Sequence, residues 1–166
     1  MELILSEVIP TVALEQEFKS TINVSIERVR LHLAFLNIDK ATNPGTLTLT
    51  IKDSTGLTVA SKAQTFAQIK TAGGANFGTA LDSITQQWHG MVSFIFASPV
   101  NLRQGIYKLY LDSTYTYTAD TIWVGWVRQH DNMTYQTYAN ESFPTDLNQE
   151  EVPHTFEIYS WKKLVD

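Results

Sequence analysis

The dominant pattern in this chain is the alternation of apolar and polar residues at every second position. Two such runs, at residues 92–96 and 107–111, are separated by a segment that holds Pro99 and Gly105. Because successive side chains of a β-strand point to opposite faces, this period predicts strands with one buried face. Proline cannot donate to a ladder and glycine tolerates positive φ, so we expect a β-connection between the runs, with the apolar side chains of 100–102 turned inward.

The same alternation recurs along most of the chain. The expected strands are residues 12–18, 22–26, 29–35, 47–51, 57–60, 92–96, 107–111, 122–127 and 154–161, after a short apolar segment at residues 3–9. The phase slips by one residue at Glu27, as a β-bulge or a tight break between strands would produce, and Asp53-Ser54-Thr55-Gly56 is typical of a hairpin turn. The sequence therefore predicts an all-β fold, a single-domain antiparallel β-sandwich (jelly roll) of roughly eight to ten strands. Residues 1–166 form this domain, with 1–10 as an N-terminal arm or edge strand.

One segment near the middle of the chain shows no single period. Residues 63–70 have helical spacing after a capping pattern of Ser61 and Gln64,. The threonines and glycines that follow favour a loop or a strand instead. We interpret residues 70–82 as a long excursion with a flexible tip at Gly73-Gly74.

Composition narrows the function classes. Charged residues make up 17% of the chain and the formal net charge is -5, with no basic cluster, which disfavours nucleic-acid binding,. There is no cysteine, so neither a disulfide framework nor a thiolate metal site is expected,. The apolar stretches are too short to span a bilayer, and MELILSEVIP lacks a basic leader before a long apolar run,. We therefore expect synthesis in a cytoplasm without a signal peptide and without membrane insertion.

Residue types of common active sites are present without the spacing that those sites need. The four histidines, His32, His89, His130 and His154, form no zinc-binding motif,. Glu15 and Glu17 share a strand face about 6–7 Å apart, a separation compatible with glycoside hydrolysis, but we expect that face to meet water. We predict no catalytic residue, metal ligand or cofactor. The three side chains that could bind a structural calcium ion are Asp112, Asp120 and Asp131.

Aromatic side chains are the more informative candidates. The alternation that turns Val124 and Trp126 inward turns Trp123 outward,. Outward rings can bury area against another subunit or stack on sugar rings, or loops of the same domain can cover them. The candidate ligand- or interface-binding residues are Trp123, Tyr110, Tyr159, Trp161, Trp88, Tyr115, Tyr117, Tyr135 and Tyr138.

The order of strand and turn residues between 16 and 161 forms a larger pattern. It comprises QEF at 16–18, VRLHLAF at 29–35, PGTLTLTI at 44–51, Gly56, WHGMVSFIF at 88–96, Leu102, Gly105, Tyr107 and FEIY at 156–159. This order resembles jelly-roll β-sandwiches of the carbohydrate-binding-module type, found in secreted bacterial proteins and in bacteriophage tail, fibre and decoration proteins. The resemblance implies a non-catalytic module that binds glycans or other proteins. Such modules often hold a structural calcium, but no cluster of Asp and Asn here matches that site.

Because the sequence shows no such leader, it favours the virion proteins of this family over its secreted members. We therefore expect a non-enzymatic virion structural module that acts by protein–protein contact in a homo-oligomeric assembly. Its expected partners are other virion proteins and copies of itself. They would cover the outward rings of Trp123, Tyr110, Tyr159 and Trp161, with Leu3, Ile4 and Leu5 as an arm for a neighbour. The alternative is a carbohydrate-binding or receptor-recognition module. That module would bind a cell-surface glycan on a platform of exposed rings or in a loop-built cleft, formed by Trp88, Trp123, Tyr115, Tyr117, Tyr135 and Tyr138.

Overall fold

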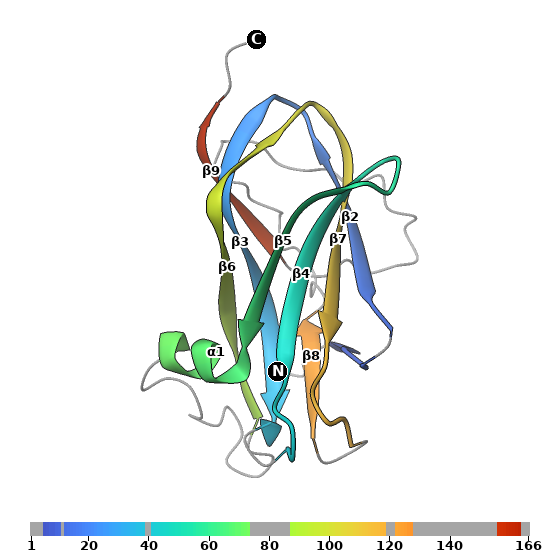
Figure 1. The fold of residues 1–166 in the computed structure, drawn as a ribbon, viewed down its shortest axis with the longest axis vertical. Coiled ribbons are helices and arrows are strands. Elements are labelled where there is room, and N and C mark those ends of the chain that lie inside the picture. Colours follow the sequence, from blue (N-terminus) through green and yellow to red (C-terminus); the bar gives the residue numbers. More distant parts are fainter. Residues whose placement is uncertain are drawn as a thin grey trace.

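The computed structural model in Figure 1 describes residues 5–10, 12–38, 41–73, 87–118, 122–127 and 156–163. These residues form nine strands and one helix. In chain order they are β1 (Leu5–Glu7), β2 (Leu14–Ser20), β3 (Val24–Leu36), β4 (Thr46–Asp53), β5 (Thr58–Thr65), α1 (Phe66–Gly73), β6 (Gln87–Leu102), β7 (Gly105–Ser113), β8 (Trp123–Val127) and β9 (Phe156–Lys163). Among the described residues, no helix is long and apolar enough to cross a membrane.

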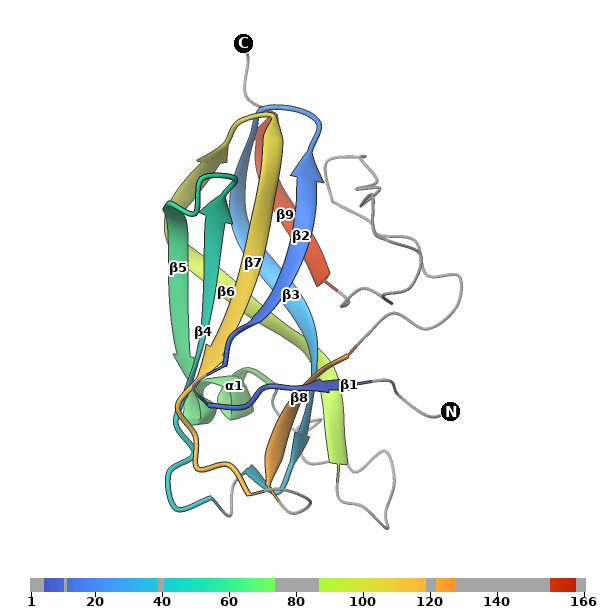
Figure 2. The ribbon, with the colours of Figure 1, turned by 90° about the vertical axis from the view of Figure 1, so that its right-hand side faces the viewer.

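The strands form two antiparallel sheets that pack face to face, as Figure 2 shows. One sheet has the order β2-β7-β4-β5. The other has the order β1-β8-β3-β6, and β9 also pairs with β3. Strands β8 and β9 share β3 as a neighbour, since β8 pairs with residues 33–36 and β9 with residues 24–31. The predicted all-β, two-sheet antiparallel sandwich is confirmed. The N-terminal segment supplies an edge strand, because β1 pairs with β8; Leu3 and Ile4 lie outside the described residues.

The core lies between the sheets and follows the period of two. In β4, Leu47, Leu49 and Ile51 are buried while the threonines between them are partly exposed. Phe18 on β2 is fully buried, stacks on Tyr107 with ring centroids 5.6 Å apart, and reaches Phe156 of the opposite sheet at 6.0 Å. The largest fully buried side chains are Trp126, Phe18, Phe94, Ile26, Leu31, Leu33, Leu49, Ile51, Leu102, Leu109, Leu111 and Ile158.

The phase slip at Glu27 is a β-bulge, the first of the two predicted alternatives: Ile26 pairs with Ser160 and Arg28 with Tyr159 of β9, so Glu27 is an extra residue on β3. The pairing of β3 with β6 is irregular at the same place. Ile26 pairs with Val100 and Arg28 pairs with Ile95, so residues 96–99 of β6 lie opposite Glu27 alone. Pro99 falls in this irregular stretch of an edge strand, where a residue without an amide N–H is tolerated,.

The predicted β-connection before Gly105 is shorter than expected. Strand β6 continues through Pro99 to Leu102, which leaves only Arg103 and Gln104 between β6 and β7. Because β6 and β7 belong to different sheets, this turn carries the chain across the sandwich. The Tyr107 hydroxyl donates to the Arg103 carbonyl at 2.8 Å and Leu102 is buried, so the end of the sandwich closes over the core.

The predicted hairpin at Asp53 to Gly56 is confirmed. Asp53 Oδ1 accepts hydrogen bonds from Thr55 N at 2.9 Å, Thr55 Oγ1 at 2.6 Å and Leu57 N at 3.0 Å. These donors, the Thr55 hydroxyl first, hold the pKa of Asp53 below its ordinary value,. Gly56 has φ of 86°, which glycine adopts without steric cost,. The carboxylate thus fixes the turn that joins β4 to β5.

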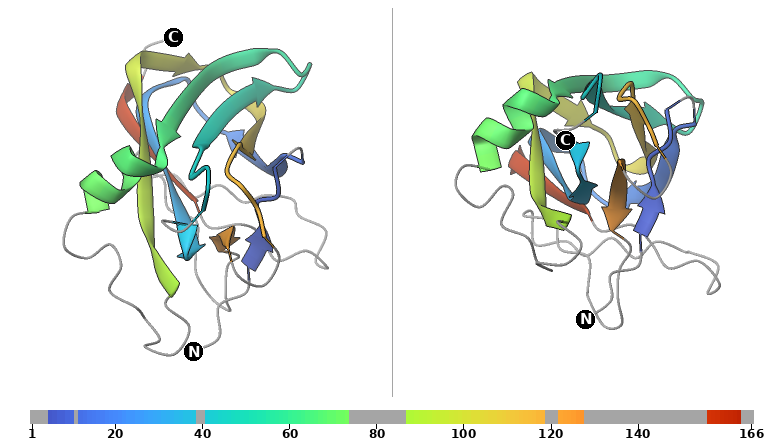
Figure 3. Two further views of the ribbon diagram at one scale, coloured as in Figure 1. Left: turned by 60° about the horizontal axis from the view of Figure 1, so that its bottom comes forward. Right: turned by 90° about the horizontal axis from the view of Figure 1, so that it is seen from below.

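A helix follows β5 directly, where the sequence left the structure open between helix and loop. Figure 3 shows α1 at the end of β5, beside β6. Its start is a capping box at Thr65 and Gln68, four residues beyond the expected pair: Thr65 N donates to Gln68 Oε1 at 2.9 Å, and Gln68 N donates to Thr65 Oγ1 at 3.2 Å,. Phe66 and Ile69 are buried, which anchors the helix to the core. The predicted excursion is therefore wrong for residues 70–73, and the remainder of it lies outside the described residues.

Replacing Thr65 with alanine is expected to lower the free energy of unfolding by about 1 kcal/mol, because the Gln68 N–H loses its acceptor at the helix start. Thr71 is a matched control, since it lies in the same helix, is also exposed, and its hydroxyl donates to the Ala67 carbonyl. Thr71→Ala should change the unfolding free energy by less than about 0.5 kcal/mol. Urea denaturation measures both values. Equal losses for the two variants would contradict the capping role.

Candidate functional site

Tyr115 belongs to the core rather than to the surface. It is 3% exposed, and its hydroxyl donates to the Val8 carbonyl at 2.8 Å and accepts from Val124 N at 3.2 Å. The predicted exposed ring is therefore wrong. The inward phase of Leu111 and Ser113 continues past the end of β7 to Tyr115, so the ring enters the sandwich. Its hydroxyl therefore links strand β8 to the segment that follows β1.

Trp123 points away from the main core, as predicted, but the chain itself covers it. Val124 and Trp126 belong to the main core, whereas Trp123 forms a separate cluster on the other face of the sheet with Ala34 and Leu36. Tyr117 packs on this cluster and is partly buried. With 8% of its surface exposed, Trp123 offers little area to a partner. The expectation of an exposed Trp123 is wrong, and the alternative of cover within the same domain holds for it.

The remaining aromatic candidates divide between one described residue and five that fall outside the description. Tyr110 is partly exposed on the outer face of its sheet. The side chains of Trp88, Tyr159 and Trp161, and the whole of Tyr135 and Tyr138, lie outside the described residues. A binding role for those five residues stays a prediction. The candidate site is centred on Tyr110.

Tyr110 lies near the middle of the outer face of the β2-β7-β4-β5 sheet. Leu109 and Leu111 point into the core, so Tyr110 and Lys108 point outward. No described helix or strand lies over this face in Figure 2. Strand pairing sets Tyr110 between Glu15 of β2 and Thr50 of β4. In the next row Lys108 lies between Glu17 and Lys52.

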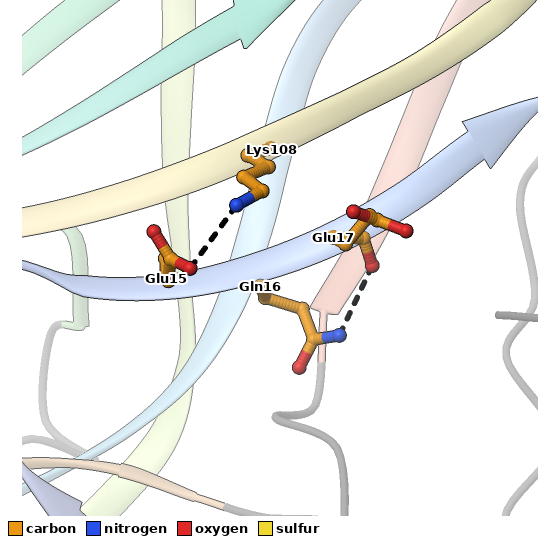
Figure 4. A network of polar contacts seen from close by, with 4 residues as sticks. All are labelled: Glu15, Gln16, Glu17 and Lys108. Atoms are coloured by element: carbon orange, nitrogen blue, oxygen red, sulfur yellow. Dashed lines mark hydrogen bonds and ion pairs between the residues drawn. The ribbon is translucent and has the colours of Figure 1, made fainter. Parts of the chain in front are cut away.

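Three polar contacts organise this outer face. Lys108 Nζ lies 3.2 Å from Glu15 Oε1, an ion pair drawn in Figure 4. Lys52 Nζ lies over the Tyr110 ring at 4.4 Å from its centroid, which is a cation–π contact,. The Thr50 and Ser61 hydroxyl oxygens are 3.2 Å apart.

The ionisation of this face follows from these contacts. The pKa of Lys108 is raised chiefly by its hydrogen bond to Glu15, so its ammonium stays charged,. The pKa of Tyr110 is also raised, first by partial desolvation and then by the negative charge of Glu15,. At neutral pH the face therefore carries charges of both signs around a neutral phenol.

Glu15 and Glu17 face water, as expected from the sequence. Both side chains are exposed, and Glu15 is held by Lys108. Gln16 between them is 4% exposed on the opposite face, and its Nε2 donates to the Glu17 carbonyl at 3.0 Å, as Figure 4 shows. The two carboxylates thus lie on an open surface, without the apolar enclosure of a catalytic acid.

A small apolar cavity of about 10 Å³ lies beside Tyr115. Its lining includes Phe35, Ile38, Leu47, Phe66, Ile69 and Val124. Even one water needs roughly 10–15 Å³ and several polar partners, so this cavity is a packing gap rather than a ligand site. Within the described ranges, no group of three or more histidine or carboxylate side chains could hold a metal ion. Asp112 is exposed, and Asp120 and Asp131 lie outside those ranges.

Comparisons with protein-family models, with curated proteins and with solved structures give no match for this chain. A β-sandwich by itself hosts many unrelated functions. The feature that bears on function is therefore the outer face of the β2-β7-β4-β5 sheet.

Proposed function

We propose that this chain is a non-enzymatic virion structural module of the jelly-roll, carbohydrate-binding-module type, comparable to bacteriophage tail, fibre or decoration proteins. It acts by protein–protein contact in a homo-oligomeric assembly. The observation that carries the proposal is the outer face centred on Tyr110, which combines an aromatic ring with Glu15, Lys52 and Lys108 on a regular sheet. Tyrosine is enriched at protein interfaces, and complementary charges fix the register of such contacts.

The state of the Tyr110 ring favours a protein partner over a sugar. A sugar stacks on the open face of an aromatic ring, but Lys52 already lies over this ring,. A protein partner can use the Lys52–Tyr110 pair as it stands, through carboxylates that reach the ammonium. Two of the rings that the glycan alternative names, Tyr115 and Trp123, are buried.

Sedimentation velocity over micromolar to near-millimolar concentrations tests the proposal. We expect reversible, concentration-dependent association of the purified chain. Added salt should weaken it, because exposed charges are screened beyond roughly 8–10 Å at physiological ionic strength. A monomer at every concentration and every ionic strength would contradict a homo-oligomeric module.

A glycan array separates the alternative from the proposal. We expect no glycan class to bind this chain. A glycan class that binds on the array and also changes the tryptophan fluorescence on titration would favour the carbohydrate-binding alternative.

A further inference from the structure

In two rows of the outer face of the β2-β7-β4-β5 sheet, those of Tyr110 and Lys108, the charges are separated by strand. There β2 presents Glu15 and Glu17, β7 presents Lys108, and β4 presents Lys52; Lys19 of β2 lies one row further, beside Ile106. Since β2 and β4 are the two neighbours of β7, the carboxylates and Lys52 lie at equal distances, about 4.8 Å, on either side of it,. In these two rows the face therefore changes sign across β7.

Such a face is complementary to a copy of itself. A two-fold axis that runs along β7 lays β2 of one copy over β4 of the other. Glu17 and Lys52 are in the same row of the sheet, each paired with Lys108, so the rotation brings Glu17 of each copy to Lys52 of the other,. Tyr110 meets Tyr110 near the axis, and Glu15 faces the Thr50 hydroxyl.

We infer that this face binds a second copy of the chain, face to face and with two-fold symmetry, through reciprocal Glu17–Lys52 ion pairs. The inference rests on the proposed function and identifies one contact of the assembly. Within the described part of the chain, neither Glu17 nor Lys52 makes an ion pair of its own.

The residues nearest the axis are compatible with this contact. Lys108 of each copy approaches its symmetry mate, but Glu15 of the same chain neutralises it at 3.2 Å. Ile106, 45% exposed on the same strand, supplies an apolar contact. Asp112 lies further along β7, where the rotation of about 30° between stacked sheets separates the two copies.

The area of this face determines how tightly two copies are expected to bind. Four strands about 4.8 Å apart and about seven residues long cover roughly 450 Å² per copy. This is below the roughly 800 Å² per partner of a standard interface. The pair should therefore be weak in isolation and effective where many copies repeat it.

Two charge reversals test the contact. Glu17→Lys and Lys52→Glu each place like charges across the interface twice, and each should weaken dimerisation at least about tenfold. Mixing the two variants in equal amounts restores both pairs in the mixed dimer, so association should return to within about threefold of the original. Both variants keep a net negative charge, because each substitution changes the net charge of -5 by two, so a general attraction cannot explain recovery. Lys70→Glu on the exposed side of α1 is the control and should leave dimerisation unchanged.

Sedimentation velocity of the single variants, the mixture and the control gives the readout. Circular dichroism checks folding, and the milder pair Glu17→Gln and Lys52→Gln replaces any variant that fails to fold. Recovery in the mixture supports the inference. If the unmodified chain associates and both variants associate equally well, the contact is elsewhere while the proposed assembly stands. If the unmodified chain never associates, the proposed function and this contact are both wrong.

Discussion

Replacing Gly45 with alanine should lower the free energy of unfolding by about 2–5 kcal/mol. Gly45 has φ of 68°, and a Cβ there would lie 2.4 Å from the Tyr115 backbone nitrogen and 2.6 Å from its Cα. Backbone atoms cannot move aside as a flexible side chain can. The close approach is held on both sides, because Asn43 Nδ2 donates to the Thr114 carbonyl at 2.8 Å and Thr46 N donates to Thr114 Oγ1 at 3.0 Å.

Gly56 provides the matched control for Gly45. Its φ of 86° also lies in the left-handed region, but nothing lies within 4 Å of an added Cβ. Gly56→Ala should therefore cost only the conformational strain, about 1–2 kcal/mol. Urea denaturation of both variants measures the difference. A loss for Gly45→Ala no larger than that for Gly56→Ala would contradict the packing of the 43–46 loop against Tyr115.

Replacing Phe18 with alanine should lower the free energy of unfolding by about 3–5 kcal/mol. Phe18 is fully buried and contacts Tyr107 of its own sheet and Phe156 of the opposite sheet. Removing the ring leaves a cavity between two sheets that cannot close without moving strands. We expect the urea midpoint to fall while the slope of the transition stays constant, since the fold itself persists.

An exposed apolar residue, Leu57, is the control for the Phe18 substitution. Leu57 is 67% exposed at the β4–β5 hairpin, so Leu57→Ala should change the unfolding free energy by less than about 0.5 kcal/mol,. A small effect for Phe18→Ala, comparable to that for Leu57→Ala, would mean that the two sheets do not close over this ring.

The sequence was sufficient to predict those features of the fold that depend on residues close together along the chain. Period-two burial in β4, the bulge at Glu27 and the hairpin at Asp53 all follow from residues within a few positions of one another,. The capping box was only approximately placed, because Ser61-Gln64 and Thr65-Gln68 carry the same pattern. Pairing of β5 with β4 decides between them, since it keeps residues 58–65 extended.

Exposure of the aromatic rings depends on segments that are distant in sequence. Alternation predicts correctly that Trp123 points away from the main core, but Ala34 and Leu36 of β3 and Tyr117 cover it. The same limit applies to the candidate site. Lys108 could be found from the sequence, two positions before Tyr110 on one strand face, whereas Lys52 joins them only through the register of β4 against β7.

Cysteine cross-linking tests most directly whether the outer face of the β2-β7-β4-β5 sheet is a contact between copies. The chain has no cysteine, so one introduced thiol reports alone. Lys108→Cys lies near the inferred axis and keeps Tyr110, Glu17 and Lys52, whereas Thr71→Cys lies on the exposed side of α1. Under mild oxidation Lys108→Cys should form disulfide-linked dimers far faster than Thr71→Cys. Equal, slow cross-linking of both variants at concentrations where the chain associates would contradict this face as the contact.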